Sequence, residues 1–512
     1  MSETTQIEDT SKNCSRYAWA LIAVGALLRV VSFFFSNNSG GDAGAHVELT
    51  AIWLQHPTVK FVFAVYPPGH FWLIGLSTLI VHDVFTAGRL LSLVLGIASL
   101  ILVWKTARLL YGMWGGLLSL GVFSLYSLHI GYSTTSSAEV SAVFFCLAGI
   151  YFFFRYFQSG ADRAWPLAIS GACFSVAQSI RYEPWVLFAG LFVILIVLLQ
   201  VQPVRRPWGD SLRPVLVFGI TGGMWPVFIL AYAWQRFGNP LYLVHLNQLA
   251  AITFMAANPI SRIHQLALPP SVLLLSLSPL ALVGAVYGLA KSFSSRLPCA
   301  FASLTIFLGL FYAYEFSTGG MLAVARYTLI PGTMLAIVSG YGLEEICEKL
   351  FPNRIGLAHS AIFGLLFLNL VAVLAMSDLP NRYAEKFASI SPRLRYQERI
   401  RLVGEYLRSH MRPDDAVVVD NYNAESDIIA IAAGLPIIPG KRAYLLSKKY
   451  TMSVDDYINA EHPRFLVYAE RGTLQHSFQL PPGCMGIEEI HGVKFQCTYA
   501  GPTYRVYELN YQ

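Results

Sequence analysis

The sequence predicts a polytopic α-helical membrane protein that carries a small α/β domain after its last membrane span. Of the 512 residues, 55% are hydrophobic and only 13% are charged, whereas a soluble protein carries about 25% charged residues. The hydrophobic residues gather into runs of about 20, the length that a helix needs to cross a bilayer. These runs end before residue 379, and the remaining tail has the composition of a soluble domain. We therefore expect a membrane domain over 1–378 and a second domain over 379–512.

The apolar runs give the expected spans in order. Eleven of them are long enough to cross a membrane, at residues 17–36, 86–105, 112–131, 138–157, 164–180, 184–202, 214–235, 270–290, 298–315, 326–345 and 358–377. The apolar run at 70–82 is too short to cross. We expect a re-entrant or interfacial helix there, since counting it as a span would invert the topology of everything that follows.

Charge placement predicts which side of the membrane each loop faces. Lys and Arg gather at cytoplasmic span ends, and with the N-terminus inside, thirteen of them lie there: Lys12, Arg16, Lys105, Arg108, Arg155, Arg163, Arg205, Arg206, Arg213, Lys291, Arg296, Lys349 and Arg354. Six lie in the opposite short segments: Lys60, Arg89, Arg181, Arg236, Arg262 and Arg326. The loop 37–69 and the tail are thus expected on the outer side of the cytoplasmic membrane.

The tail reads as a small α/β domain. "YQERIRLVGEYLRSHM" has the apolar spacing of a helix, "DDAVVVD" is typical of a buried strand, and "SDIIAIAAG" of a helix that ends at Gly434. "PRFLVYA" and "TYRVYEL" indicate further strands. Asp420 follows the first strand, and we interpret it as structural because no Gly-rich turn accompanies it. Cys484 and Cys497 are close enough in sequence to form a disulfide.

Two other classes of site are not indicated. The chain has seven cysteines but no C-x-x-C or Cys/His spacing of a zinc site. The net charge of +6 is modest and lies in short loops between apolar runs, which fits cytoplasmic span ends better than a nucleic-acid surface. We expect no nucleic-acid partner.

The ionisable residues at the outer ends of the spans are the candidate functional residues. Asp42 follows the first span, Glu139 begins a later one, Arg181 and Glu183 share an outer turn, and Arg326 opens another span. Charges at this depth are costly unless they are paired or hydrated, so each is a functional candidate. Each also has a local alternative, since Asp42 could be a solvated loop residue and Glu139 a helix N-terminal carboxylate. Arg181 and Glu183 could form a local ion pair, and Arg326 could reach lipid headgroups.

Several short motifs occur in a fixed order around these residues. Asp42 is followed by the amphipathic "AHVELTAIWLQH", then by "YPPGHFWLIG" and by "AGRLLSLVLGIASLILVWKTARLLYG". Glu139 lies in "SSAEV", and Arg326 and Tyr327 precede Pro331. In this order, over residues 15–380, the chain resembles the polyprenyl-phosphate-dependent membrane glycosyltransferases of the C type. That family includes the aminoarabinose transferases of lipid A and the protein O-mannosyltransferases.

The resemblance implies a sugar donor linked to polyprenyl phosphate and a lipid, glycan or protein as acceptor, with membrane lipids around the site. Such a reaction needs a carboxylate to take the acceptor proton and cations around the phosphate. Asp42 would be the general base, and Glu139 would orient the acceptor or help to hold a divalent metal ion. The donor and acceptor would be bound by a larger set: Tyr66, His70, Arg181, Glu183, Arg326 and Tyr327. Tyr66 and Trp72 would line the lipid groove.

This chain also departs from the family pattern. Tyr66 stands before the two prolines where relatives often have Lys, and Asp42 lies in "GDAG" rather than beside a second acid or a proline. These differences argue against assigning one particular transferase. A transporter or flippase of lipid-linked saccharide is the alternative function. Transporters often show internal repeats and charges near the midplane, whereas here Arg29 alone falls well inside a span and no repeat is evident.

Overall fold

The computed structural model describes most of the chain. The described residues are 3–35, 42–55, 57–59, 66–159, 163–201, 208–257, 262–321, 324–375, 396–421, 426–436, 442–446, 452–469, 472–476, 478, 480, 484, 487–490, 492–501 and 503–511. Contacts divide these residues into two compact units. The first holds the residues up to Asp42 and those from 58 to 375. The second holds residues 43–57 and the tail.

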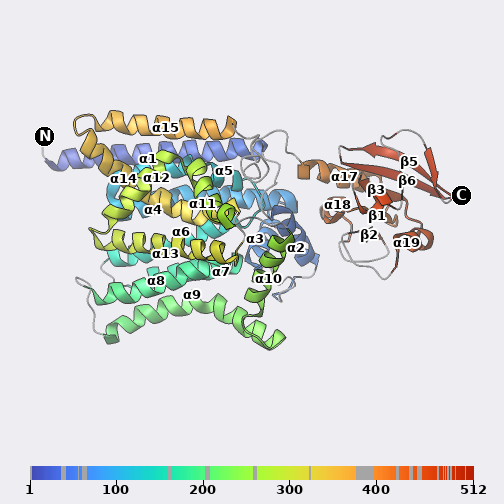
Figure 1. Cartoon of the computed structure of the whole chain (residues 1–512), viewed down its shortest axis with the longest axis horizontal. Helices are drawn as coiled ribbons and strands as arrows, with labels where there is room; N and C mark the ends of the chain where they lie inside the picture. Colours follow the sequence, from blue (N-terminus) through green and yellow to red (C-terminus); the bar gives the residue numbers. More distant parts are fainter. Residues whose placement is uncertain are drawn as a thin grey trace. The chain divides into compact units, whose positions relative to one another are not determined.

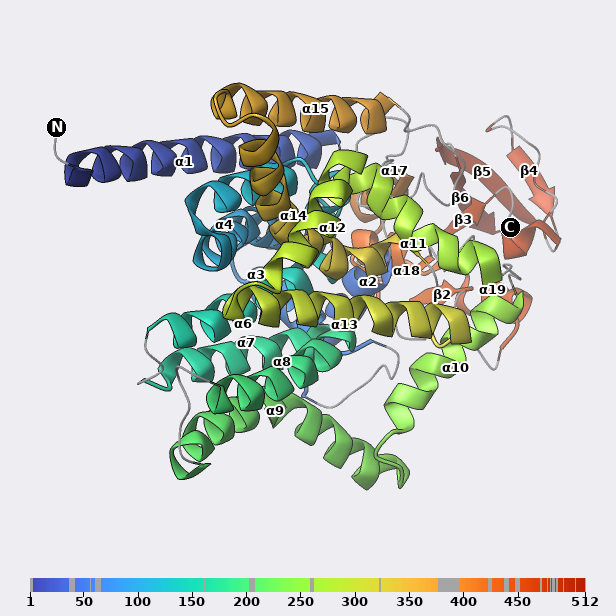
Figure 2. The same cartoon turned by 60° about the vertical axis from the view of Figure 1, so that its left-hand side comes forward.

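The first unit is built of helices (Figure 1). In chain order they are α1 Glu3–Phe35, α3 Gly69–Ser77, α4 Val84–Ser124, α5 Ser127–Tyr132, α6 Glu139–Gln158, α7 Trp165–Ile180, α8 Glu183–Gln200, α9 Trp208–Phe237, α10 Tyr242–Ala257, α11 Arg262–Leu277, α12 Pro279–Ser292, α13 Arg296–Thr318, the 3-10 helix η1 Ala325–Thr328, α14 Leu329–Leu350 and α15 Ile355–Ala375. The long helices run roughly parallel, whereas α10 crosses their direction (Figures 1 and 2).

The prediction of a polytopic helical membrane protein is confirmed. Within the described residues, seven helices are long and apolar enough to cross a membrane, or eight if the bent pair α11–α12 is one span. Helix α4 is one element of 41 residues, but Gly112 breaks it with a φ of 84°. This break separates the two runs that we predicted at 86–105 and 112–131. The short run after the prolines forms α3, a helix of nine residues.

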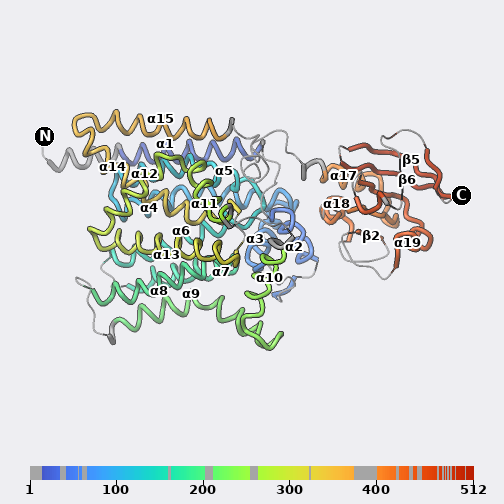
Figure 3. The backbone as a smooth tube through the Cα atoms, viewed as in Figure 1, coloured from blue at the N-terminus to red at the C-terminus, as the bar shows by residue number. Residues whose placement is uncertain are grey.

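Three expected spans differ from the structure. The run predicted at 112–131 is interrupted, because α4 ends at Ser124 and the short helix α5 begins at Ser127. We predicted one span over 270–290, but the chain turns by 107° between α11 and α12. Ser278 adopts a φ of 94° at this turn, Pro279 begins the next helix, and the Ser278 hydroxyl caps the backbone N–H of Ala281. The span predicted from residue 326 begins instead at Leu329, because Arg326 lies in η1. Average hydropathy does not report such turns. The backbone path is traced in Figure 3.

The second unit contains a mixed six-stranded sheet and its helices. The strands β1 Val417–Val419, β2 Ala443–Leu445, β3 Phe465–Ala469, β4 Ile487–Ile490, β5 Val493–Ala500 and β6 Tyr504–Tyr511 have the order β2-β1-β3-β6-β5-β4. β1 is parallel to β2 and β3, and the last three strands are antiparallel. Helices α17 Tyr396–His410, α18 Ser426–Ala433 and α19 Val454–Glu461 complete the predicted α/β domain. Helix α2, Ala43–Gln55, belongs to this unit and packs against α18.

Two details of the tail agree with its sequence. Helix α18 ends at Gly434, which has a φ of 70°, the left-handed conformation that glycine adopts at helix ends. Cys484 and Cys497 form a disulfide, with their Cα atoms 5.3 Å apart. This separation lies in the ordinary range for disulfides.

Candidate functional site

The candidate residues, which we predicted at helix ends, come together in the first unit. Asp42 comes directly before α2, Glu139 is the first residue of α6, and Arg181 follows the last residue of α7. Glu183 is the first residue of α8, and Arg326 lies in η1. These five residues form one chain of ion pairs that alternates in sign.

Arg326 lies between two of the carboxylates. Its Nη1 is 2.9 Å from Oδ2 of Asp42, which is the distance of a charge-assisted hydrogen bond. Its Nε is 3.8 Å from Oε1 of Glu139, so this second contact is electrostatic rather than a hydrogen bond. Arg326 therefore connects the residue that precedes α2 to the residue that begins α6.

Arg181 binds the other two carboxylates. Its Nη1 donates to Oε1 of Glu139 at 2.7 Å. Its Nη2 donates to Oε1 of Glu183 at 2.6 Å, and its Nε lies 3.0 and 3.1 Å from the two oxygens of that carboxylate. The planar guanidinium thus grips Glu183 along one edge and Glu139 with the other nitrogen, a geometry that lysine cannot reproduce.

The helix ends explain why these residue types occur here. Glu139 and Glu183 occupy the first positions of α6 and α8, where free backbone N–H groups favour an anion, and Arg181 caps the C-terminus of α7, where a cation is favoured. Arg181 is in extended backbone conformation and ends α7. Pro184 then starts α8 at a position that suits proline. The C-terminus of α7 therefore meets the N-termini of α6 and α8, and the cation favoured at the first pairs with the anions favoured at the other two.

Exposure distinguishes the three carboxylates. The side chains of Glu139 and Glu183 are only 3% and 5% exposed, whereas Asp42 is 24% exposed. Burying an unpaired charge is very costly, so the two glutamates depend on Arg181. Burial alone would lower the pKa of Arg181 and Arg326, but the adjacent carboxylates, Glu183 and Glu139 for the first and Asp42 for the second, raise it above its usual value. Both arginines thus stay charged, and Asp42 is the carboxylate that a substrate can reach.

Two tyrosines complete the charged network. The ring of Tyr327 lies under both arginines, with its centroid 5.1 Å from Cζ of Arg181 and 5.5 Å from Cζ of Arg326. Guanidinium groups at this range are attracted by the ring face, so Tyr327 holds the two like charges side by side. The Tyr66 hydroxyl hydrogen-bonds to Asp42, and burial, followed by the negative charge of Asp42, raises the pKa of Tyr66. The residue that replaces the family's usual lysine thus contacts the candidate base.

His70 and Trp72, both expected to bind substrate or lipid, lie outside the charged network. His70 is fully buried, and its Nε2 donates to the backbone carbonyl of Ser136 at 2.9 Å. Burial lowers the pKa of His70 to about 4, so the ring is neutral at physiological pH. His46 lies buried in α2, in the other unit. Trp72 packs edge-to-face against Trp225 of α9 at 5.9 Å.

The carboxylates do not fit a divalent metal site as they are arranged here. Each of the three lies against an arginine, and the described part of the chain holds no group of three or more His, Cys, Asp or Glu that could bind a metal ion. The oxygen Oε2 of Glu139 has no hydrogen-bond partner, but the nearest groups that we find around this carboxylate are cations. We derive no step that uses a metal.

Two other features lie apart from the network. Asp420, at the end of β1, accepts backbone N–H bonds from Asn421, Ala469 and Leu474 at 2.8 to 3.1 Å. Burial raises its pKa and these donors oppose the shift, as expected of a carboxylate that fastens a loop.

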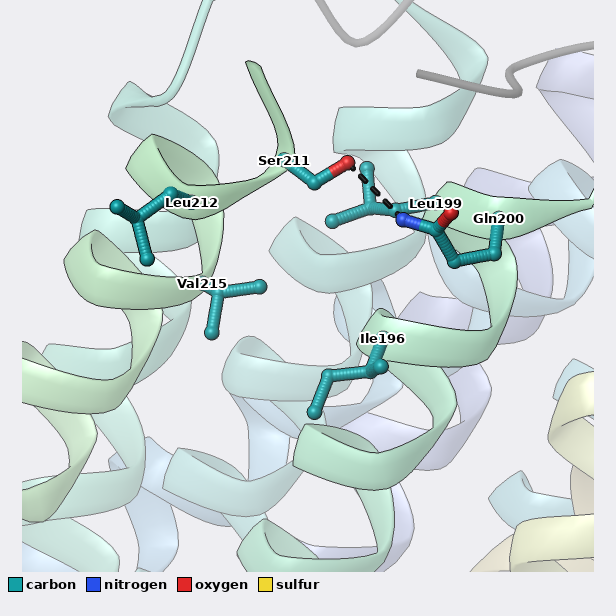
Figure 4. A pocket seen from close by; sticks show the side chains of 6 residues that line it. All are labelled: Ile196, Leu199, Gln200, Ser211, Leu212 and Val215. Atoms are coloured by element: carbon teal, nitrogen blue, oxygen red, sulfur yellow. Dashed lines mark hydrogen bonds between the residues drawn. The ribbon is translucent and has the colours of Figure 1, made fainter. Parts of the chain in front are cut away.

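An apolar pocket of about 110 Å³ lies between the end of α8 and the start of α9, where Gln200 donates to Ser211 (Figure 4). It is at the opposite end of α8 from Glu183.

Comparison with known proteins identifies the fold. Residues 65–236 match the family described as dolichyl-phosphate-mannose-protein mannosyltransferase. The structure superposes on ArnT from Cupriavidus metallidurans, solved with undecaprenyl phosphate, with a TM-score of 0.63 at 11% identity, covering 96% of this chain and 98% of that one. The chain has the C-type glycosyltransferase fold. The oligosaccharyltransferase AglB of Archaeoglobus fulgidus, solved with an inhibitory peptide and a dolichol-phosphate, has a TM-score of 0.52 at 12% identity, covering 88% and 69%.

These similarities confirm the resemblance expected from the sequence. The family match includes Tyr66, His70, Glu139, Arg181 and Glu183 but ends before Arg326 and begins after Asp42. No curated protein sequence matches the chain. The fold is thus supported by the superposition of almost the whole chain on a solved structure. The proposed roles of the network residues rest instead on the distances between their charged groups.

Arg181 should be essential for folding as well as for any role in binding. We expect Arg181→Ala to lower the Tm of the detergent-solubilised protein, because removing one partner of a buried ion pair costs about 3–5 kcal/mol and here two buried glutamates lose theirs. Arg155, at the other end of α6, is exposed and donates to the hydroxyl of Tyr151 at 2.6 Å. Arg155→Ala is the matched control and should leave the Tm nearly unchanged. Equal Tm values for the two variants would contradict the proposed dependence.

Proposed function

We propose that this protein transfers a sugar from a polyprenyl-phosphate-linked donor to an acceptor at the outer face of the cytoplasmic membrane, with inversion at the anomeric carbon. The acceptor would be a lipid, a glycan or a protein. The observation that carries the proposal is the ion-pair network, in which an accessible carboxylate, Asp42, pairs with Arg326, and Glu139 links Arg326 to the second arginine, Arg181. The shared fold of two solved transferases supports it.

The proposed reaction uses the network as follows. Asp42 takes the proton of the acceptor nucleophile as that atom attacks the anomeric carbon of the donor. The bond between this carbon and the phosphate oxygen breaks, and polyprenyl phosphate leaves with the bonding electrons. Arg326 and Arg181 stabilise the negative charge on the leaving phosphate, since guanidinium groups can bind phosphate through two nitrogens. One direct displacement inverts the configuration.

The other residues of the network would hold these groups in place. Glu139 and Glu183 fix the guanidinium plane of Arg181, and Tyr327 keeps the two arginines together. Tyr66 hydrogen-bonds to Asp42 and would hold its carboxylate in place. Glu139 also lies close enough to Arg326 to contact an acceptor bound there.

No observation favours the alternative of a transporter or flippase. Arg29, the one charge that falls well inside a predicted span, donates to the carbonyls of Gly25, Phe123 and Ser124 and to Nδ1 of His129. These contacts fasten α1 to the end of α4, as expected of a structural arginine inside a helical bundle.

The identity of the donor is the direct test of the function. The protein should be purified from its native membranes, and the lipids that copurify should be identified by mass spectrometry. We expect a polyprenyl-phosphate sugar, and membranes that contain the protein should release polyprenyl phosphate from a synthetic short-chain analogue of it. Transport of an intact lipid-linked saccharide without release of the phosphate would support the transporter instead.

The proposed topology is tested by cysteine labelling. We expect a cysteine at Val59, which is 69% exposed, to react with a membrane-impermeant maleimide from the outer side of sealed vesicles. A cysteine at Asn353, an exposed residue between α14 and α15, should react only from the cytoplasmic side. Both should be made in a variant whose accessible native cysteines are replaced. Reaction of Val59→Cys from the cytoplasmic side alone would overturn the proposed location of the site.

A further inference from the structure

Helix α3 touches the two segments that carry Glu139 and Arg181. It begins directly after the two prolines, and its first residues are Gly69 and His70. Neither residue is part of the ion-pair network. His70 contacts the backbone three residues before Glu139, and Gly69 contacts the backbone two residues before Arg181. The position of this short helix therefore bears on the geometry of the site.

His70 contacts the segment before Glu139. Its Nε2 lies 2.9 Å from the carbonyl oxygen of Ser136, and because a carbonyl only accepts, Nε2 carries the proton. Ser136 precedes Glu139 by three residues, in a turn whose side chains are all buried. Arg89 of α4 donates to the carbonyl of Thr134 in the same turn, at 3.0 Å. The turn that leads into α6 is thus held by side chains from two helices, α3 and α4, which donate to its backbone carbonyls.

Gly69 contacts the segment before Arg181. A Cβ on Gly69 would lie 2.7 Å from the carbonyl oxygen of Ser179 and 2.8 Å from its carbonyl carbon. Real Cβ atoms do not approach the backbone so closely, so only glycine lets α3 lie against the end of α7. Ser179 precedes Arg181 by two residues, so any shift of this contact moves the guanidinium.

A small apolar cluster joins the same three elements. Ala138, Ala142 and Ile180 form its buried part, and Leu73 of α3 packs against them. Ala138 is the neighbour of Glu139 and Ile180 is the neighbour of Arg181. Leu73 lies one turn after Gly69 and His70, so α3 presents all three contacts from its first two turns.

We propose that His70 and Gly69 are positioning residues that set the spacing of Glu139 and Arg181, His70 by holding the start of α6 and Gly69 by holding the end of α7. This rests on the proposed function, since it gives the network a role in transfer. The proposal gives the two residues different effects. His70 acts through Glu139 and thus on turnover, whereas Gly69 acts through Arg181 and thus on the affinity for phosphate.

The test compares substitutions at His70 that keep or remove the hydrogen-bond donor. Turnover is measured as release of polyprenyl phosphate from a synthetic short-chain polyprenyl-phosphate sugar at saturating donor. We expect His70→Leu to lower turnover by about tenfold or more, because a misplacement of about 1 Å in a catalytic site can cost about a hundredfold. His70→Gln keeps an N–H donor at similar reach and should restore most of the turnover. Undecaprenyl phosphate should bind to both variants with nearly unchanged Kd.

A double-mutant cycle shows whether His70 acts through Glu139. In the background of Glu139→Gln, the effect of His70→Leu should largely disappear, since effects of residues that act through one another are not additive. His359→Leu is the matched control: His359 is a buried histidine on α15 beside Trp114, and its loss should have the same proportional effect in both backgrounds. For the second half of the proposal, Gly69→Ala should weaken the Kd for undecaprenyl phosphate more than His70→Leu does.

The outcomes separate the inference from the proposed function. Full turnover in Glu139→Gln and Asp42→Asn would overturn the function itself. If those variants are impaired but His70→Gln is as slow as His70→Leu, or the cycle is additive like that of His359→Leu, then His70 has only a structural role and the inference is wrong. Unchanged phosphate affinity in a folded Gly69→Ala variant would remove the second half.

Discussion

Asp42→Asn should lower turnover by about a hundredfold or more, the usual scale for the loss of an acid–base group. The amide keeps the size of the side chain, and its oxygen can still accept the 2.9 Å hydrogen bond from Arg326. It cannot take a proton, so the chemical step is lost while the geometry remains. The measurement is release of polyprenyl phosphate from a synthetic short-chain polyprenyl-phosphate sugar, together with the Kd for undecaprenyl phosphate, which should change little.

A matched control is available at the start of α4. Asp83 caps α4 by accepting from the backbone N–H of Thr86 at 2.9 Å, and asparagine caps helices equally well. Asp83→Asn should therefore keep full turnover. A fully active Asp42→Asn variant would remove Asp42 from catalysis. The stereochemistry of the product, read by NMR, is a second check, because retention would indicate a covalent intermediate and contradict the direct displacement.

Arg326→Ala should weaken binding of undecaprenyl phosphate by about tenfold to a hundredfold. Hydrogen bonds to charged groups contribute about 1.5–3 kcal/mol each, and Arg326 lies at the exposed end of the network, next to Asp42, where a lipid phosphate can reach it. Its loss leaves the more buried pairs of Arg181 in place, so the effect on folding should be smaller than that of Arg181→Ala. Calorimetry with undecaprenyl phosphate in detergent gives the Kd directly.

Charge and geometry can be separated at this position. Arg326→Lys keeps the charge but loses the planar fork, so it should restore the affinity only in part. Arg354→Ala, an exposed arginine between α14 and α15, removes the same charge elsewhere and should leave the Kd unchanged. If Arg326→Ala binds undecaprenyl phosphate as tightly as the unchanged protein, Arg326 is a headgroup contact and not a donor ligand.

The sequence predicted the helices well where composition alone decides them. The span expected at 138–157 is α6, Glu139–Gln158, because a long apolar run with an acidic first residue defines both its length and its start. The bend at Ser278 was missed, since a hydropathy average is the same for a straight and a bent helix. Helix α10, Tyr242–Ala257, was missed, because the segment between the spans predicted at 214–235 and 270–290 was expected to be a loop.

The residues of the network were predicted individually, but their pairing was not. Asp42, Glu139, Arg181, Glu183 and Arg326 were chosen for their charge and place at helix ends, and the local pair of Arg181 with Glu183 was foreseen. The contact of Arg326 with Asp42 joins segments from opposite ends of the membrane domain, and a single sequence carries no signal for such pairing. The support from α3 was missed for the same reason, since Gly69 reads as a helix start rather than as a close contact.

The assignment of α2 to the second unit limits how this protein can be recombined with its relatives. Asp42 belongs to the first unit, whereas the next residue, Ala43, begins a helix that packs on α18 of the tail. A chimera that joins a foreign tail at the end of α15 would separate α2 from the helix against which it packs. Exchange of the tail together with residues 43–57 keeps that pair intact, so the modular boundary of this protein is discontinuous and passes next to Asp42 in the sequence.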